Sequence, residues 1–410
     1  MTVALSCQTC SVWYTYYCWR LPIVSLPIVS LFIVSLPIVS LPIVSLFIVS
    51  LFIETECPMY IVDAHEDIAW NALVLGRDVR HSALKTRHLE QDTDVPQRNG
   101  LCMVGLPEWL AGGIAVVCGS LFVAPASRAS PEPHTYTTAE EAHALGQAQL
   151  DYYHRLADEC DQIALIGTRA DLDSVLTSWE SEIPQVGIVP LMEGADPIRE
   201  PAEAEMWFER GVRLVGLSWR TGSRYAGGDA APGPLTDAGR ELLGVMADLG
   251  LILDVSHLAE GSFFEAVDRF EGRVVATHAN PRARVPGPRQ LSDEMIRRLA
   301  ERDGVIGIVP FNRFLRPGWA KGDPKGTVTV ADVAAAIDHV CQVVGDAAHV
   351  GLGSDFDGGF GAESAPAEID TVADLARIGP ALGELGYGEE DIAAVLGSNW
   401  LRVLRAALPE

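Results

Sequence analysis

Residues 61–73 read IVDAHEDIAWNAL. Two apolar residues, Ile61 and Val62, are followed at once by a segment that contains His65 and Asp67. In a barrel of parallel strands the strand interiors are apolar, and functional side chains follow where the strands end. The stretch therefore predicts a buried parallel strand that carries chemistry at its C-terminal end.

Short β-branched runs alternate with longer segments of helical pattern through the rest of the chain. Runs that are apolar on both faces are what a parallel, fully covered sheet requires. Eight such runs predict an α/β protein with a (β/α)8 TIM-type barrel. The runs are YIVDAH (60–65), GIAVVCGSLFV (113–123), VGIVPLMEG (186–194), VRLVGLSW (212–219), LILDVSH (251–257), RVVATHA (273–279), GVIGIVP (304–310) and HVGLGSDF (349–356). A ninth run, QIALIG (162–167), predicts a small extra strand.

A doubly wound open sheet is the alternative architecture for this alternating pattern. It would need a glycine-rich phosphate loop after an early strand, and no GxGxxG motif occurs there. Helices are predicted over residues 138–158, 237–250 and 293–303. Ser292 is the expected N-cap of the last of these helices.

A pentapeptide repeat over residues 21–53, of the form LPIVS or LFIVS, precedes the alternating region. Its period of five fits neither a helix nor a strand, and its prolines would interrupt both. We interpret residues 1–58 as a low-complexity leader, produced by a translated tandem DNA repeat, that is not part of the native protein. Met59 is then the natural start, and residues 59–410 are one domain. A membrane anchor and a structured repeat are the alternatives for the leader.

The chain is acidic, with 30 Lys and Arg residues against 55 Asp and Glu residues and a formal charge of −25. Nucleic acids and anionic membranes bind basic surfaces, so neither is an expected partner. The body of the chain contains Cys102, Cys118, Cys160 and Cys341 without the spacing of a disulfide framework. They are expected to be reduced thiols of a soluble, cytoplasmic protein.

Six side chains that can bind a metal fall at the ends of five predicted strands. A single histidine at a strand end is more often an ordinary polar residue, so the prediction rests on all six occurring at the same end of the barrel. The six are His65 and Asp67 after the first run, Glu193 after the third, His257 after the fifth, His278 after the sixth and Asp355 after the eighth.

Imidazole and carboxylate groups together can hold two divalent ions bridged by one carboxylate and one water. The two residues after the first run would begin one metal site, the two histidines of adjacent strands would form the second, and Glu193 would bridge them. The ions would lower the pKa of the bridging water and produce hydroxide near neutral pH. Asp355 would accept the water's proton and pass it to the leaving amine. The ligand set suits two Zn²⁺ ions, and Mn²⁺ or Fe²⁺ would also fit.

The sequence resembles the membrane dipeptidase (renal dipeptidase) family of the metal-dependent amidohydrolase superfamily, over about residues 60–407. The motifs that carry the resemblance, in matching order and spacing, are DAHED (63–67), MEG (192–194), DVSH (254–257), THAN (277–280) and GSDFDG (353–358). The segment EEDIAAVLGSNWLRVL (389–404), with Asn399, matches the closing helix of the family. The resemblance implies a binuclear zinc dipeptidase, a metallopeptidase that cleaves the amide bond of dipeptides. It also allows a D-residue at the C-terminal position.

The resemblance implies a role for each matching residue. The ligands of the first metal fall on His65 and Asp67, the bridging glutamate on Glu193, the histidines of the second metal on His257 and His278, and the acid/base aspartate on Asp355. The arginine that binds the substrate carboxylate falls on Arg289, with Arg282 and Arg284 as nearby competitors. A guanidinium group would capture a free C-terminal carboxylate with two hydrogen bonds.

Two positions depart from the family pattern. The family carries a histidine after the fourth strand, in an L-T-H pattern, where this chain reads Leu217-Ser218-Trp219. We expect the donor that Trp219 cannot supply to come from Arg220, Arg224 or Tyr225. Asn312 stands where the family has a tyrosine after the seventh strand. The metal site is therefore expected to be complete. The substrate pocket, with Arg289, Trp219, Arg224, Tyr225 and Asn312 as its predicted substrate-binding residues, is expected to be altered.

The sequence thus predicts a hydrolase that acts on a small dipeptide, with a homodimer expected only from the resemblance. The altered pocket leaves a cyclic amide or N-acyl amino acid hydrolase as the alternative activity. A metal-binding scaffold without turnover is the alternative from another class, and an acid/base aspartate at position 355 argues against it.

Overall fold

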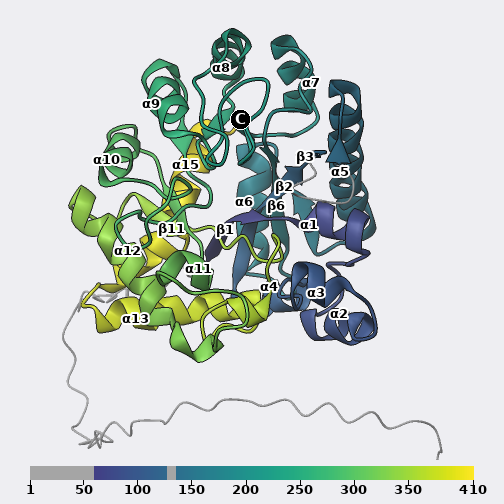
Figure 1. The fold of residues 1–410 in the computed structure, drawn as a ribbon. Coiled ribbons are helices and arrows are strands. Elements are labelled where there is room, and N and C mark those ends of the chain that lie inside the picture. The colour runs from purple at the N-terminus through teal and green to yellow at the C-terminus, as the bar shows by residue number, and fades with distance from the viewer. Residues whose placement is uncertain (1–59, 127–134) are drawn as a thin grey trace, which may run out of the picture. The chain divides into compact units, whose positions relative to one another are not determined.

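The computed structural model describes residues 60–126 and 135–410, and the elements of this part are labelled in Figure 1. Residues 1–59 lie outside the described residues. The structure therefore does not test the interpretation of residues 1–58 as a leader, with its repeat at 21–53, or the start at Met59.

The described residues contain eight parallel strands in the order β10-β11-β1-β2-β6-β7-β8-β9. A parallel bridge between Ala276 and Ile306 joins the two ends of this order, which closes the barrel. Figure 1 shows the helices arranged around the strands. The predicted (β/α)8 barrel is confirmed. The strands are β1 (Ile61–Glu66), β2 (Ile114–Phe122), β6 (Val186–Glu193), β7 (Leu214–Gly216), β8 (Ile252–Asp254), β9 (Val274–Val275), β10 (Ile306–Ile308) and β11 (Val350–Leu352).

Three further strands lie outside the barrel order. The predicted extra strand is β5 (Ile163–Leu165), which pairs in parallel with β6. The sequence did not predict β3 (Ala124–Pro125) and β4 (Thr135–Tyr136), which form a separate two-stranded sheet.

Several barrel strands are shorter than the apolar runs that predicted them. In the run 251–257, only Ile252–Asp254 is strand. The Asp254 carboxylate accepts hydrogen bonds from the backbone N–H groups of Ser256 and Thr277, both at 3.0 Å. This side-chain acceptor replaces ladder partners, because backbone N–H groups that leave a sheet still need an acceptor. The last residues of the run are thereby free to form the turn that carries His257.

The helical elements cover the outside of the barrel and form the connections between strands (Figure 1). They are α1 (Ile68–Trp70), η1 (Asn71–Leu75), α2 (Ala83–Glu90), α3 (Val95–Asn99), α4 (Leu106–Gly112), α5 (Ala139–Glu159), α6 (Arg169–Ser178), η2 (Pro201–Glu203), α7 (Ala204–Glu209), α8 (Asp237–Leu249), α9 (Glu260–Arg269), α10 (Asp293–Glu301), α11 (Asn312–Leu315), η3 (Lys325–Thr327), α12 (Val330–Val344), η4 (Ala362–Ser364), η5 (Val372–Arg377), α13 (Ile378–Glu384), α14 (Glu389–Ala393), η6 (Ala394–Ser398) and α15 (Asn399–Ala407).

The three predicted helices are present as α5, α8 and α10. Helix α10 begins after Ser292, whose hydroxyl accepts a hydrogen bond from the backbone N–H of Met295, so the predicted N-cap is confirmed. The closing segment is divided into α14, η6 and α15. Asn399 begins α15, and its Nδ2 donates to the carbonyls of Ala347 (2.7 Å) and Val350 (2.8 Å). These bonds anchor the closing helix beside β11.

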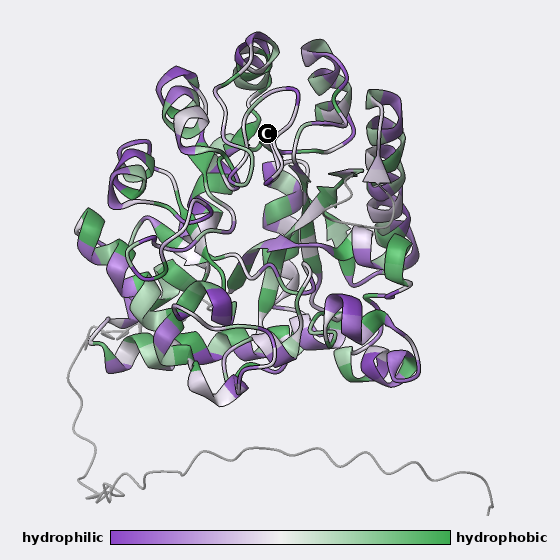
Figure 2. Ribbon diagram, in the orientation of Figure 1, coloured by the Kyte–Doolittle hydropathy of each residue, from purple (hydrophilic) through white to green (hydrophobic). Residues whose placement is uncertain are grey.

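The barrel strands are buried on both faces, as a fully covered parallel sheet requires. Every residue of β2 and of β6 is buried. The helices have apolar and polar faces, and Figure 2 shows apolar residues concentrated toward the strands. None of the helices in the described residues is both long and apolar enough to cross a lipid bilayer.

Candidate active site

The six predicted metal-binding residues all lie at the C-terminal ends of barrel strands. His65 is the second-to-last residue of β1, Glu193 is the last residue of β6, and the other residues lie just beyond β1, β8, β9 and β11. Parallel strands bring their C-terminal ends to one rim of a barrel, which is why residues far apart in sequence meet there. The structure therefore brings together all six residues that the sequence singled out.

Two of these residues occupy a left-handed backbone conformation, with φ of 64° at His257 and 56° at Asp355. Such a conformation costs a non-glycine residue about 1–3 kcal/mol and persists only where its surroundings hold it. Asp229 N donates to His257 O at 2.8 Å, and Asp355 N donates to His65 O at 3.0 Å. The strained turns aim both side chains at the centre of the rim.

Glu193 lies at the centre of the cluster, and its two carboxylate oxygens face different histidines. Oε2 lies 3.5 Å from His65 Nε2. Oε1 lies 3.2 Å from His257 Nε2 and 3.3 Å from His278 Nε2. This division of the two oxygens is the arrangement that a carboxylate bridging two cations needs.

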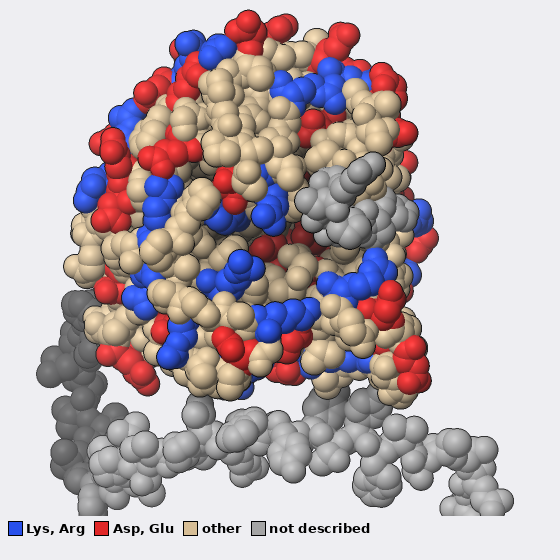
Figure 3. All heavy atoms as spheres, in the orientation of Figure 1, with Lys and Arg blue, Asp and Glu red and all other residues tan. Residues whose placement is uncertain are grey.

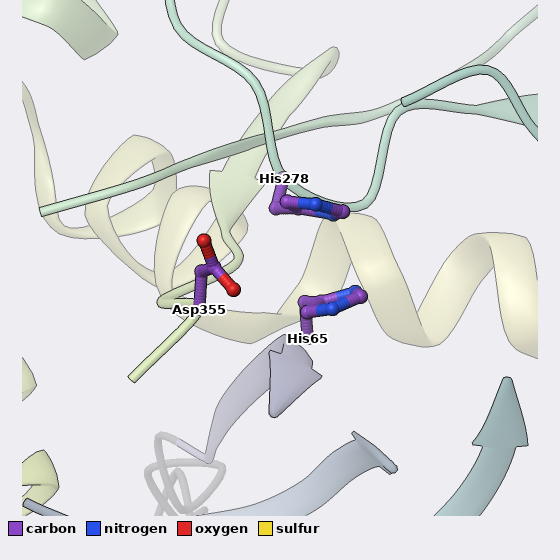
Figure 4. Close-up of side chains that lie close together, drawn as sticks. All are labelled: His65, His278 and Asp355. Carbon is purple, nitrogen blue, oxygen red and sulfur yellow. The ribbon is translucent and has the colours of Figure 1, made fainter. Parts of the chain in front are cut away.

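Three overlapping groups of ligand atoms could each hold a cation, with all atoms of a group within 4.8 Å of one another. Figure 4 shows one group, in which the ring of His278 lies over that of His65 at an interplanar angle of 33° and Asp355 lies beside them. The ring centroids of these two histidines are 3.7 Å apart. The groups are His65, His278 and Asp355; Glu193, His257 and His278; and His65, Asp67 and Glu193.

Burial and mutual charge strongly shift the ionisation of His65, Asp67 and Glu193. Burial alone would lower the pKa of His65, but the contact with Glu193 and the charges of Asp67 and Asp355 together outweigh it, and the pKa rises to about 10. Burial opposes ionisation of Glu193, yet the charge of His65 and hydrogen bonds from the histidines hold its pKa well below the usual range. Burial and the charge of Glu193 raise the pKa of Asp67 to about 6. The metal-free site thus retains protons that a cation would displace.

The pKa values of Asp355 and His278 are also shifted. Burial raises the pKa of Asp355 well above its usual value, and the charges of Asp67 and Glu193 add to the effect. Burial, with the charges of His65 and Arg289, lowers the pKa of His278 far below the usual value. A neutral imidazole and a basic carboxylate are the forms that metal binding and proton transfer require.

The donor set fits divalent metal ions. His65 Nε2 is buried and has no hydrogen-bond partner. His257 Nε2 and His278 Nε2 lie only 3.1 Å apart and both face the same carboxylate oxygen. Buried polar atoms are normally paired, and lone pairs aimed at a common point are typical of a cation site. Imidazole and carboxylate ligands together suit zinc, manganese or iron.

A shell of polar residues around the ligands fixes their orientation. Thr277 Oγ1 donates to Asp254 Oδ2 at 2.6 Å and lies 2.9 Å from His278 Nδ1. Since this hydroxyl has only one proton, it accepts from Nδ1–H of His278 and leaves Nε2 free to bind a cation. His257 Nδ1 lies 3.4 Å from Asp229 Oδ1 in the same manner.

The sequence reasoning missed these orienting residues. Asp254 and Thr277 stand inside the DVSH and THAN motifs, so their places next to a ligand were a usable signal. Asp229 lies in the loop after β7, 28 positions before His257, and no local pattern marks it. The hydroxyl of Ser120, on β2, donates to Asp67 and was likewise missed.

A cavity of about 270 Å³ opens above the ligands. Figure 3 shows a hollow in this face of the molecule with acidic side chains within it and basic side chains around it. Among the described residues, the predicted metal-binding residues in its wall are Asp67, Glu193, His257 and Asp355. Its basic residues are Arg98, Arg220 and Arg289. Its aromatic residues are Trp70, Phe122, Trp219, Phe311, Phe314 and Phe360.

Arg289 and Trp219, predicted to bind the substrate, both line this cavity. Arg289 Nη2 donates to the carbonyl of His278 at 2.5 Å, whereas its buried Nη1 has no partner. Of the competing arginines, Arg282 forms an ion pair with Glu260 at 2.6 Å, and neither it nor Arg284 is in the cavity wall. Among the three, the geometry therefore favours Arg289.

The structure does not place Arg224, Tyr225 or Asn312 among the residues of the cavity wall. Tyr225 is fully buried, and its hydroxyl donates to the carbonyl of Ile198 at 2.5 Å. Arg224 donates to two backbone carbonyls, each at 3.1 Å. Asn312 Nδ2 donates to the carbonyl of Ala365 at 2.9 Å, while the neighbouring aromatic residues of its helix face the cavity. These three residues hold loops in place.

The fold and this site define a metal-dependent hydrolase barrel. The chain belongs to the family "Membrane dipeptidase (Peptidase family M19)", whose model matches residues 54–408. This is a family of metallopeptidases that includes named dipeptidases, so the predicted enzyme class and family are confirmed.

Among curated relatives, the chain is 33% identical over 230 residues to an uncharacterized protein in the pqqA 5′ region of Klebsiella pneumoniae. The match covers 54% of this chain and 82% of that protein. This chain is also 30% identical over 203 residues to dipeptidase aclJ of Aspergillus oryzae. That match covers 48% of this chain and 46% of the dipeptidase.

Solved structures show the same fold. The crystal structure of the dipeptidase AC, a metallopeptidase of family M19, superposes with a TM-score of 0.70 at 24% identity, covering 86% of this chain and 99% of that chain. A metallopeptidase from Rhodobacter sphaeroides, bound to a phosphinate mimic of the dipeptide L-Ala-D-Ala, superposes with a TM-score of 0.68 at 23% identity, covering 85% and 99%. At these identities the likeness establishes the barrel.

Proposed function

We propose that the protein is a binuclear dipeptidase, most simply a zinc enzyme, that hydrolyses the amide bond of a dipeptide. The observation that carries the proposal is the position of Glu193, with one oxygen facing His65 and the other facing His257 and His278. Family membership supports the reaction class.

The ligands divide into two sets about Glu193. His65 and Asp67 would hold one ion, and His257 with His278 would hold the other. Two divalent ions bound there would supply Lewis acidity and lower the pKa of bound water. Manganese or iron would fit the same ligands.

Asp355 is the group placed to move the proton. It lies beside His65 and His278 at the rim and borders the cavity where substrate would bind. Its raised pKa suits a group that accepts a proton from water and returns it to the leaving amine. Replacing its carboxylate by an amide removes proton transfer while leaving an oxygen at the same place.

Arg289 would bind the free carboxylate of the dipeptide. Its buried Nη1 has no partner and its Nη2 bonds only to the carbonyl of His278, so the guanidinium can accept an anionic ligand. This capture requires a free C-terminus next to the scissile bond, which would favour dipeptides over longer chains. Of the donors proposed to replace the histidine that Trp219 displaces, only Arg220 lines the cavity.

A D-residue at the C-terminal position is part of this proposal. It is supported by the Rhodobacter sphaeroides structure, whose ligand mimics L-Ala-D-Ala. The four described cysteines are free, which supports a reducing, cytoplasmic location. The homodimer stays a prediction from the resemblance.

The Asp355→Asn variant tests the proposed machinery. We expect metal content to be retained and turnover to fall by at least about 100-fold, because general acid–base catalysis typically contributes that much. Unchanged turnover with metals bound would remove Asp355 from its role. The aromatic cavity wall and Trp219 favour one second candidate, a hydrolase of cyclic amides or N-acyl amino acids, which the same assay would detect with those substrates.

A further inference from the structure

Basic side chains gather at the mouth of the cavity, although the chain as a whole is acidic. The sequence has 30 Lys and Arg residues against 55 Asp and Glu residues. Arg98, Arg220 and Arg289 nevertheless line one cavity among the described residues, and Figure 3 shows basic side chains around the hollow. One main-chain carboxylate of a dipeptide accounts for Arg289. It gives no anionic ligand to Arg98 or to Arg220, which the proposed function uses only as a candidate donor in place of the family's histidine.

Arg220 has no internal partner that explains its position. Within the described residues its guanidinium forms no hydrogen bond or ion pair, and it only lies over the ring of Trp219 at 5.8 Å. Its backbone is fixed, because Arg220 O accepts a hydrogen bond from Ala230 N at 2.8 Å. A cation held on an ordered loop, exposed to a cavity and unpaired, is available to an anionic ligand.

The order of the strands places Arg220 near the expected position of the C-terminal residue of the substrate. Arg289 follows β9 and Arg220 follows β7, and β8 is the only strand between them. Both residues line the same cavity, so one bound ligand can meet both guanidinium groups. Arg98 lies in the connection between β1 and β2, in a different sector of the rim.

We propose that the preferred substrate is a dipeptide whose C-terminal residue carries a second carboxylate, and that Arg220 binds this side chain. The inference rests on the proposed dipeptidase function and extends it to a substrate class. With the main-chain carboxylate on Arg289, the side chain of the same residue can turn toward the neighbouring sector. A basic side chain at that position would meet Arg220 with like charge.

The test compares Ala-Asp, Ala-Asn, Asp-Ala, Ala-Lys and Ala-Ala, each with an L- or D-residue at the C-terminus, on the metal-loaded full chain. We expect kcat/KM for Ala-Asp to exceed that for the isosteric Ala-Asn by about tenfold or more, as a charge-assisted hydrogen bond would give. Asp-Ala should show no such advantage, and Ala-Lys should be the poorest substrate. Equal values for Ala-Asp and Ala-Asn would overturn the inference.

Two variants assign the preference to a residue. In Arg220→Gln, kcat/KM for Ala-Asp should fall to about the value for Ala-Asn, because the side chain at position 220 no longer carries a charge. Arg220→Lys keeps the charge and should restore part of the preference for Ala-Asp. The matched control is Arg98→Gln, which removes the same charge from the same cavity in another sector and should retain the preference. The assignment would be overturned if Arg98→Gln lost the preference for Ala-Asp over Ala-Asn and Arg220→Gln kept it.

The outcomes separate this inference from the proposed function. Hydrolysis of Ala-Ala and Ala-Asn without any acidic preference would leave the dipeptidase standing and refute only the role of Arg220. Hydrolysis of none of the peptides, with metals bound, would refute both. The wild-type comparison of Ala-Asp with Ala-Asn decides the question even if a variant does not fold.

Discussion

The carboxylate of Glu193 and the imidazole of His257 approach each other to 3.2 Å, from Oε1 to Nε2. The other oxygen of Glu193 faces His65 at 3.5 Å. A single ion pair between Glu193 and His65 would need only one of the two carboxylate oxygens. It would not explain why the other oxygen faces His257 and His278. The proposed pair of cations sharing Glu193 would use this arrangement.

Glu193→Gln should therefore disturb both metal sites. An amide presents one oxygen and one NH2 group, and the NH2 group cannot bind a cation. We expect less than two metal ions per chain and a fall in kcat/KM of at least about 100-fold, since even residues that only orient metal ligands contribute 10- to 100-fold. Metal analysis by mass spectrometry and a dipeptide assay measure both. The exposed residue Glu205 gives the control, Glu205→Gln, and full metal content in Glu193→Gln would contradict the bridging role.

Asp229→Asn should weaken metal binding without touching a metal ligand. Asp229 Oδ1 lies 3.4 Å from His257 Nδ1 and orients the ring. We expect zinc affinity to fall by about 10- to 100-fold. At saturating zinc, kcat should recover substantially. A chelator competition titration measures the affinity, with Asp237→Asn on the exposed start of α8 as the control. Unchanged affinity would show that the contact is incidental.

Gly358→Ala should damage the site more than the fold. A Cβ atom at Gly358 would lie 2.2 Å from Asp355 Oδ1 and 2.8 Å from Asp67 Oδ2, so both carboxylates would have to move. We expect a large loss of activity with a small change in melting temperature. Gly244→Ala, in the middle of α8 with no atom within 4 Å, is the control and should be neutral or slightly stabilising. Full activity in Gly358→Ala would mean that these carboxylates are not held in place.

Zinc binding should release protons, and its affinity should rise with pH. In the metal-free protein the pKa of His65 is raised to about 10, so its ring carries a proton at pH 7 that a cation must displace. The pKa of Asp67 is raised to about 6, so its carboxyl also takes up a proton as the pH falls through that value, and binding weakens further. Calorimetric titration in buffers of different ionisation enthalpy counts the protons released. A pH-independent affinity between pH 5 and 8 would contradict these ionisation states.

The clustering of the candidate metal ligands could be predicted from the sequence because strand ends impose their position. Once eight apolar runs indicate a parallel barrel, His65, Glu193 and His278 must lie on one rim, whatever the loops do. The orienting residues Thr277 and Asp254 lie one residue before His278 and three residues before His257, so the same reasoning could have found them.

The loop residues could not be predicted in the same way. Arg224 and Tyr225 follow Trp219 closely in sequence, yet the loop turns them toward the backbone of residues 196–199. Side-chain direction in a loop depends on backbone dihedral angles that neither periodicity nor spacing determines. Asp229 reaches His257 only because the same loop folds back, with Asp229 N donating to His257 O.

The most direct test of the account is the hydrolysis of L-Ala-L-Ala and L-Ala-D-Ala by the metal-loaded protein, beside the C-terminally amidated forms and with metal content measured on the same sample. The account predicts two metal ions per chain, cleavage of at least one free acid, and a large loss of kcat/KM on amidation, because Arg289 then has no carboxylate to bind. Equal cleavage of acids and amides would remove Arg289 from its role. No cleavage of any of them, with two metal ions bound, would contradict the dipeptidase account.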